Sequence, residues 1–185
     1  MALKKPKALW FTNDEAAATL LARDPFALLV GFAIDQQVTV QTAFAGPLRL
    51  QQRVGTLDPK VLARTDLEAA FRQKPAILRF PGSMARRVQD LAQYVVDEYD
   101  GDAAKLWTTT KDSAELKRRL EALPGYGEMK VKSLSAVLAK QYGVEAAKQI
   151  APTHPTLGDV NSLDDLDAYQ AQKREHKRAR KAAQA

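Results

Sequence analysis

The chain has 185 residues, of which 45% are apolar and 27% are charged, a composition typical of a single globular protein. It contains no cysteine, which excludes disulfides, a thiolate nucleophile, a cysteine zinc site and an iron–sulfur cluster. The net charge is +6, and two histidines, His154 and His176, are too few for a histidine-rich metal site.

The sequence also argues against a membrane partner and against secretion. No apolar run approaches the roughly 18 residues that a membrane span requires. Lys4, Lys5 and Lys7 are followed by LWF and then by polar NDE, whereas a signal peptide needs a long apolar stretch. We therefore expect a cytoplasmic protein.

Helical patterns recur along the whole chain, and the period-two alternation of β-strands is nearly absent, so we expect an all-α fold. A first helix is predicted over residues 12–23, because Thr12 and Glu15 form a capping-box pattern. The Asp24-Pro25 pair then ends this helix.

A second helix is predicted over residues 25–46, PFALLVGFAIDQQVTVQTAFAG, with the proline in its first turn. It is apolar on nearly every face up to Ile34, which indicates a central, buried helix. Asp35 interrupts the apolar run at a place where an unpaired charge is costly.

The middle of the chain carries further helix signals. Asp58-Pro59 and residues 65–68 mark two short helix starts. A longer helix is predicted within FPGSMARRVQDLAQYVVDEYDG, residues 80–101, where apolar residues recur at helical spacing. SAELKRRLEAL then leads into LPGYG, residues 123–127, which predicts a helix, a hairpin turn and a helix.

The hairpin turn carries the clearest functional signal. Glycines let a backbone approach a ligand closely, and the first amides of the following helix are free to bind a phosphate. A plain turn with a glycine helix cap is the alternative. A proline, two spaced glycines and two lysines favour a grip on the nucleic-acid backbone. The residues expected to bind are Pro124, Gly125, Tyr126, Gly127, Lys130 and Lys132.

The C-terminal segment consists of a loop and a basic helix. Residues 150–162, IAPTHPTLGDVNS, are proline-rich, and Ser162 with Asp165 predicts the cap of a last, polar helix. Residues 173–181, KREHKRARK, hold six Lys or Arg and one Glu, a local charge of +5. Such a tail either contacts nucleic acid or is solvated surface.

Three segments resemble motifs of the helix-hairpin-helix (HhH-GPD) DNA glycosylase superfamily, and they follow one another along the chain as in that family. LPGYG is similar to the LPGhG hairpin, DPFALLVGFAIDQQVTVQTA resembles a buried helix with a Q-Q-T motif, and FPGSMARRVQDLAQYVVDEYDG resembles the segment before the hairpin. The resemblance runs from about residue 25 to residue 143 and is close to a bacterial branch of base-excision repair proteins. Similar hairpins also serve ligases and nucleases as plain DNA grips.

The resemblance implies a two-lobed all-α glycosylase fold over residues 1–185. Residues 25–142 would form the core lobe with the hairpin, and residues 1–24 plus 143–185 a terminal lobe with the basic tail. It also implies base flipping, in which a nucleotide rotates out of the duplex and a side chain fills the gap. Gln36 matches the family's plug glutamine; the alternative is an ordinary surface or backbone-bonded amide.

Two catalytic residues of the family are replaced. The family aspartate, which stabilises positive charge as the glycosidic bond breaks, lies in a V-D-T-H-like segment, and here Pro152 stands in its place within residues 151–154. Enzymes that also cut the backbone carry a lysine where this chain has Met129. Lys130 follows, but one residue turns about 100° around a helix, so we expect it to point elsewhere and expect no lyase activity.

Three carboxylates are candidates to replace the aspartate: Asp35 beside the plug glutamine, Glu128 beside the hairpin and Asp159 before the last helix. Asp35 is the preferred catalytic residue, because a charge within an apolar helix is costly and a catalytic role would account for it. The alternative is that Asp35 caps the helix or pairs with Arg86 or Arg87.

Loss of the aspartate favours a substrate that is already cationic, since an alkylated base is a better leaving group. We expect a monofunctional DNA glycosylase that removes an alkylated base from double-stranded DNA. The alternatives are a non-catalytic DNA- or lesion-binding protein derived from a glycosylase, and an RNA or ribosome binder using the basic tail. Candidate surfaces for stacking the base, unless they belong to the core, are Phe32, Tyr94, Trp107 and Tyr126.

The family hairpin also holds a monovalent cation, K⁺ or Na⁺, through main-chain carbonyls. By position these are the carbonyls of Glu121, Leu123 and Tyr126. Such an ion would orient the hairpin dipoles toward a phosphate. We expect no other cofactor, and a monomer associated with the nucleoid.

Overall fold

The computed structural model describes residues 3–183, apart from the side chains of Lys177, Arg180 and Lys181. Within residues 3–183 the chain forms α-helices and two short 3₁₀-helices and no strand, which confirms the predicted all-α fold. The elements are α1 (Glu15–Arg23), α2 (Pro25–Ile34), α3 (Val40–Val54), α4 (Pro59–Leu62), α5 (Glu68–Arg72), α6 (Pro81–Tyr99), α7 (Lys105–Thr108), α8 (Ser113–Glu121), α9 (Glu128–Lys140), η1 (Glu145–Ala147), η2 (Leu157–Asp159) and α10 (Leu163–Ala182).

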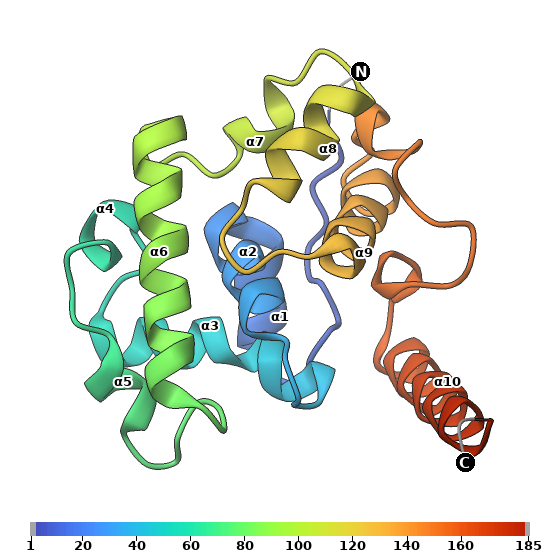
Figure 1. Cartoon of the computed structure of the whole chain (residues 1–185), viewed down its shortest axis with the longest axis horizontal. Coiled ribbons are helices and arrows are strands. Elements are labelled where there is room, and N and C mark those ends of the chain that lie inside the picture. The colour runs from blue at the N-terminus through green and yellow to red at the C-terminus, as the bar shows by residue number, and fades with distance from the viewer. Residues whose placement is uncertain (1–2, 184–185) are drawn as a thin grey trace.

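α2 is the central helix, and α1, α3, α6 and α9 pack around it (Figure 1). All its residues from Phe26 to Ile34 are buried, because its sequence presents apolar surface in every direction. Asp24 caps its start by accepting hydrogen bonds from the amides of Phe26 and Ala27 at 2.8 and 3.2 Å. Among the described helices none alone has the length and hydropathy of a membrane span, although α1 and α2 together do, as a pair bent by 115°.

The predicted helix over residues 25–46 is wrong in one respect, because residues 35–39 break it into α2 and α3. Gln37 has a φ of 56°, in the left-handed region, and a right-handed helix cannot continue through it. Thr39 then caps α3 by accepting a hydrogen bond from the Thr42 amide at 3.2 Å. The break leaves Gln36 and Gln37 exposed.

The first helix also starts later than predicted. Asp14, rather than Thr12, is its N-cap and accepts a hydrogen bond from the Ala17 amide at 3.0 Å. Thr12 is fully buried, and its hydroxyl instead accepts from the Asp14 amide at 3.3 Å. Because Thr12 is buried and its hydroxyl bonds to the Asp14 amide, Asp14 takes over as N-cap, and the helix begins two residues later than predicted.

α6 forms where the apolar spacing predicted a long helix. It buries Met84, Val88, Leu91 and Val95 and packs against α2, α4 and α5. The two predicted short helices are present too, as α4 and α5.

The N-terminal segment lies against the helix that follows the hairpin. The Lys4 amide donates to the Tyr142 carbonyl at 2.8 Å, and the Tyr142 hydroxyl donates to the carbonyls of Leu21 and Ala22 at 3.3 and 3.2 Å. α9 also packs against η1 and η2. The division into a core lobe and a terminal lobe stays a prediction.

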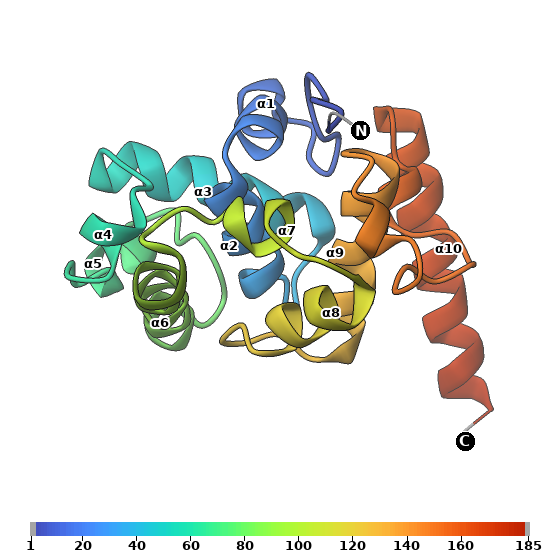
Figure 2. The ribbon, with the colours of Figure 1, turned by 90° about the horizontal axis from the view of Figure 1, so that it is seen from above.

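α10 begins as predicted, with Ser162 accepting a hydrogen bond from the Asp165 amide at 3.1 Å. Leu166 is buried against the body, but every described side chain from residue 171 to residue 183 is exposed. In Figure 2 this second half of the helix extends away from the rest of the protein. Part of the basic tail, Lys177, Arg180 and Lys181, lies outside the described side chains.

Candidate nucleic-acid interface

The predicted hairpin is formed by α8, the turn and α9. Its turn crosses in front of α2 (Figure 1). Gly125 has a φ of 80°, and an added Cβ would lie 2.6 Å from Cδ of Arg87, so both the backbone and the close contact require glycine. Gly127 has ordinary extended backbone, and a Cβ there would meet nothing within 4 Å. The space beside Gly127 is therefore open to a ligand.

The start of α9 presents free backbone amides. Gly127 is the N-cap, and no side chain caps it. The amides of Lys130 and Val131 bond to the Gly127 carbonyl at 3.0 and 3.1 Å, whereas those of residues 127–129 find no acceptor among the residues described. Free amides at the positive end of a helix favour an anion. The turn thus has the properties that the predicted phosphate contact requires, and the contact itself stays a prediction.

Lys130 turns inward to the end of α2 instead of lying along the hairpin surface. Its Nζ donates a hydrogen bond to the Ala33 carbonyl at 2.8 Å. Burial and then the positive charge of Arg87 lower the pKa of Lys130 to about 8, while the Asp35 carboxylate opposes this shift. Met129, the neighbouring residue, points outward and is 74% exposed.

Arg87 of α6 reaches the same helix end. Its Nη1 donates to Oε1 of Gln36 at 2.5 Å and to the Ala33 carbonyl at 3.3 Å. Its aliphatic stem lies against Gly125 in the hairpin. The three motif segments of the sequence therefore meet at one place, through an arginine that the motifs did not single out.

Asp35 is the C-cap residue of α2 and is half-buried. Loss of solvent raises the pKa of its carboxyl, and the positive charges of Lys173 in α10 and Lys130 in α9 oppose the rise. The alternative pairing with Arg86 or Arg87 is not found, because Arg87 bonds to Gln36 and Asp35 forms no ion pair within the described part of the chain. A desolvated carboxylate without a direct partner is suited to stabilise developing positive charge.

The other two candidate carboxylates are already in ion pairs. Glu128 pairs with Lys132 on the surface of α9 at 2.6 Å, so the predicted counter-charge of Lys132 is shared with this neighbour. Asp159 accepts hydrogen bonds from Lys140 at 2.7 Å and from the Thr156 amide at 2.8 Å, as part of the cap of η2. Both are bound to local partners, which leaves Asp35 as the one of the three candidates without an ion pair among the described residues.

Three of the four candidate stacking residues follow the alternative and belong to the core, because Phe32, Trp107 and Tyr126 are 2%, 5% and 9% exposed. The Tyr126 hydroxyl donates to the Leu29 carbonyl at 2.7 Å, and burial raises the pKa of this phenol. Only the main chain of Tyr126 is available to DNA. Tyr94 packs against Tyr99 with ring centroids 6.3 Å apart.

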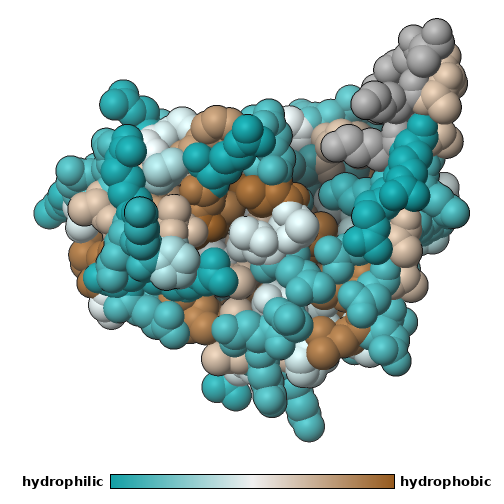
Figure 3. Space-filling view, turned by 90° about the horizontal axis from the view of Figure 1, so that it is seen from below, coloured by the Kyte–Doolittle hydropathy of each residue, from teal (hydrophilic) through white to brown (hydrophobic). Residues whose placement is uncertain are grey.

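Phe80 is a candidate interface residue that no sequence motif indicates. Its ring is 45% exposed, with the Arg79 guanidinium 5.5 Å from the ring centroid. It directly precedes α6, whose first turn lines a hollow of about 530 Å³ together with Pro124 and Gly125. An exposed apolar ring beside a basic group is suited to insert between bases. On the side where α6 begins, Figure 3 shows apolar surface bordered by hydrophilic side chains.

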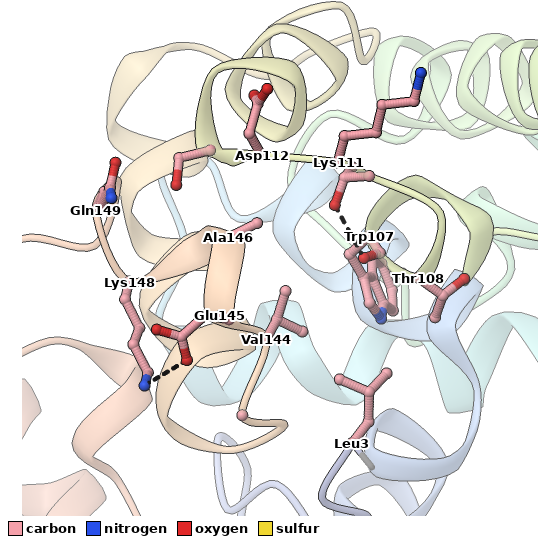
Figure 4. A pocket seen from close by; sticks show the side chains of 13 residues that line it. Leu3, Trp107, Thr108, Lys111, Asp112, Val144, Glu145, Ala146, Lys148 and Gln149 are labelled. Atoms are coloured by element: carbon pink, nitrogen blue, oxygen red, sulfur yellow. Dashed lines mark hydrogen bonds and ion pairs between the residues drawn. The ribbon is translucent and has the colours of Figure 1, made fainter. Parts of the chain in front are cut away.

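A larger hollow, of about 750 Å³, lies elsewhere, between α7, the start of α8 and η1 (Figure 4). Its polar groups serve the fold. Asp112 caps α8 by accepting from the Glu115 amide at 2.8 Å, and Glu145 pairs with Lys148 at 2.6 Å. None of the turn residues 123–127 lines it, so we do not assign the DNA site there.

The three hairpin carbonyls expected to hold a monovalent cation accept few hydrogen bonds. Those of Glu121 and Tyr126 accept no hydrogen bond from the described residues, and that of Leu123 accepts one, from the Tyr126 amide at 3.1 Å. Each therefore keeps a lone pair for an ion. Side-chain clusters of His, Asp or Glu that could hold a metal are absent from the described residues. The cation stays a proposal.

Comparison with known proteins agrees with the geometry. A family model described as the HhH-GPD superfamily of base excision DNA repair proteins matches residues 30–183, which include α3, α6, the hairpin and the loop of residues 35–39. Neither the curated proteins nor the solved structures give a match. Because the family match spans most of the chain and its motifs meet in space at the end of α2, the chain belongs to the DNA-binding HhH-GPD superfamily of base excision DNA repair proteins.

Proposed function

We propose that this protein is a monofunctional DNA glycosylase that removes an alkylated base from double-stranded DNA, acting as a monomer at the bacterial nucleoid. The observation that carries the proposal is Asp35. This half-buried carboxylate lies at the end of α2, next to Gln36 in the chain and within electrostatic range of Lys130 in α9 and Lys173 in α10, with no ion-pair partner among the described residues.

Each part of the interface has a distinct task in this proposal. The free amides at the start of α9 bind a backbone phosphate, with no preference for sequence. Gln36, exposed on its loop, fills the gap that the flipped nucleotide leaves. As the bond between base and sugar breaks, the Asp35 carboxylate stabilises the positive charge on the sugar until water adds to it.

Two observations support monofunctional chemistry. Met129 occupies the lysine position of enzymes that also cut the backbone, and its side chain has no amine to attack the sugar. Lys130 binds the Ala33 carbonyl. An alkylated base supports its own departure because it is cationic, so a single carboxylate is a sufficient partner.

Pro152, in place of the family aspartate, favours a second candidate, a lesion-binding protein without catalysis. Both candidates share the hairpin grip and the plug. They differ only in whether a base is released, which makes them separable by one assay. Competition between duplex DNA and RNA tests the further alternative of an RNA binder.

The deciding experiment is single-turnover excision from duplexes carrying alkylated, oxidised or deaminated bases. Asp35→Asn keeps the shape of the side chain and removes its charge, so excision of the alkylated base should fall by about 10²-fold or more, with binding unchanged. The variant should be at least as stable as the wild type, because the raised pKa of Asp35 means that its ionised form costs stability at neutral pH.

Matched controls are Glu128→Gln and Asp159→Asn, which remove carboxylates that are already paired. Neither should lower excision by a comparable factor. If the wild-type protein binds the lesions but releases no base, the recognition protein replaces the enzyme. If Asp35→Asn excises as fast as wild type, catalysis does not depend on this carboxylate.

A further inference from the structure

Arg87 joins two elements that lie far apart in the sequence. Its stem packs so closely on Gly125 that a Cβ there would meet Cδ and Cγ at 2.6 and 3.0 Å. Its guanidinium donates to the side chain of Gln36, 51 residues earlier, at 2.5 Å. A shift of the hairpin therefore acts on Arg87, and a shift of Arg87 acts on Gln36.

Gln36 depends on this contact for its orientation. Among the described residues, Arg87 is the one hydrogen-bond partner of its side-chain amide. The loop that carries it bends at Gln37, which has a φ of 56°. A charged donor to a flexible amide restricts the rotamers of that amide before any ligand binds.

The end of α2 does not depend on Arg87 in the same way. The Ala33 carbonyl accepts a shorter hydrogen bond from Lys130, at 2.8 Å, than from Arg87, at 3.3 Å. Removing the guanidinium would leave this helix end capped. Its effect should therefore be concentrated on Gln36.

We propose that Arg87 is a positioning residue, which holds Gln36 ready to fill the gap in the duplex and couples it to the phosphate grip of the hairpin. The role rests on the proposed function, since it requires that the protein flips a nucleotide. A side chain that is ordered in advance loses less entropy when it enters the DNA, so the flipped state is favoured.

The first test uses the free protein and does not depend on DNA. Arg87→Met keeps the stem and removes the guanidinium, and Arg86→Met removes the same charge from the exposed neighbour on α6. Hydrogen exchange of the Gln36 backbone amide, which donates to the Ile34 carbonyl at 2.8 Å, should become faster by on the order of tenfold in Arg87→Met. It should stay at the wild-type rate in Arg86→Met. Equal exchange in all three proteins would overturn the proposal.

The second test measures flipping, from the fluorescence of 2-aminopurine placed beside a lesion in a duplex. Arg87→Met should lower the flipped fraction by on the order of tenfold, whereas Arg86→Met should lower only the affinity. In a Gln36→Ala background, Arg87→Met should cause no further loss, because Arg87 acts through Gln36. Additive losses in this double-mutant cycle would overturn the positioning role.

The two tests also separate this inference from the function on which it rests. If wild-type protein binds the duplexes but produces no 2-aminopurine signal, the proposed flipping function fails, and the role of Arg87 fails with it. If flipping and excision are intact but hydrogen exchange in the loop is the same in Arg87→Met as in wild type, the function stands and this inference alone is refuted.

Discussion

Two cations converge on a single carbonyl at the end of α2. Lys130 and Arg87 both donate to Ala33, at 2.8 and 3.3 Å. The last carbonyls of a helix are unpaired and carry partial negative charge, so cations are favourable there. They also repel each other in a partly buried place, and burial together with the charge of Arg87 brings the pKa of Lys130 to about 8.

Lys130→Met should remove a pH dependence of stability. The pKa of Lys130 falls from 10.5 to about 8 on folding, so between these values the unfolded chain binds more protons and the free energy of unfolding rises with pH. Without this group, the curve of unfolding free energy against pH should be flatter. Urea denaturation between about pH 7 and about pH 9.5, below the usual titration of tyrosine, measures the difference.

Lys132→Met is the matched control, since it removes an exposed lysine from the same helix. It should keep the wild-type slope. A Lys130→Met curve parallel to the wild-type curve would show that the ammonium is not desolvated in the folded protein.

Gly127→Asp should separate stability from DNA binding. Gly127 is an uncapped N-cap with open space around it, and aspartate is a favourable N-cap residue beside the positive end of a helix. The variant should therefore be as stable as wild type or more stable, by about 0.3–1 kcal/mol from the cap and the helix dipole together. Its carboxylate would occupy the phosphate position, so affinity for all duplexes should fall alike.

Gly125→Ala is the contrasting variant in the same turn. Its left-handed φ and its contact with Arg87 should make it less stable by about 1–3 kcal/mol. Denaturation and duplex titration of both variants check these outcomes. Wild-type affinity in a folded Gly127→Asp protein would remove the hairpin from the DNA interface.

At the scale of elements, the spacing of apolar residues predicted most of the helices, because helix formation depends largely on neighbouring residues. The helices on both sides of the hairpin, and α6, follow from apolar spacing that the structure buries as expected. The break after α2 was missed because Val38 and Val40 continue the apolar pattern across it. Its signals were present, in the charged Asp35 and in Thr39, which caps α3. An apolar pattern indicates which residues are buried, but it does not show whether the helix continues without a break.

In α10, too, the sequence indicated the basic segment but not where the helix lies on the protein. Its basic segment was predicted from composition, but the closeness of Lys173 to Asp35 was not, because it depends on how Leu166 and Tyr169 seat the helix on the body. Beyond residue 171 the described side chains are exposed, so they are accessible to a DNA backbone.

Truncation after Gln172 tests this element. If the segment KREHKRARK contacts phosphates, its removal should flatten the dependence of log affinity on log salt by somewhat less than one unit per lost contact, about 0.9 for duplex DNA. Thermal unfolding should change little, because the described side chains removed are exposed. An unchanged salt slope would mean that the segment is solvated surface.

At the scale of the whole molecule, the site depends on contacts that no local pattern encodes. Tyr126 bonds to Leu29 and Lys130 to Ala33, each across 97 residues, and Arg87 bonds to Gln36 across 51. The motifs predicted that these segments belong to one interface. Which side chain turns toward the core is decided by packing, and the sequence alone left open whether the ring of Tyr126 stacks on a base or belongs to the core; it is buried against α2.

Tyr126→Phe and Tyr126→Ala test whether this tyrosine fixes the hairpin to the central helix. Loss of the hydroxyl removes one buried hydrogen bond and should cost about 1 kcal/mol of unfolding free energy, whereas loss of the ring should cost about 3–5 kcal/mol. Because the ring still seats the turn, folded Tyr126→Phe should bind duplex DNA as wild type does, and Tyr126→Ala should bind weakly. Urea denaturation and duplex titration measure both quantities. If Tyr126→Phe lost DNA affinity while keeping its stability, the hydroxyl would have to contact DNA rather than Leu29, contrary to its buried position.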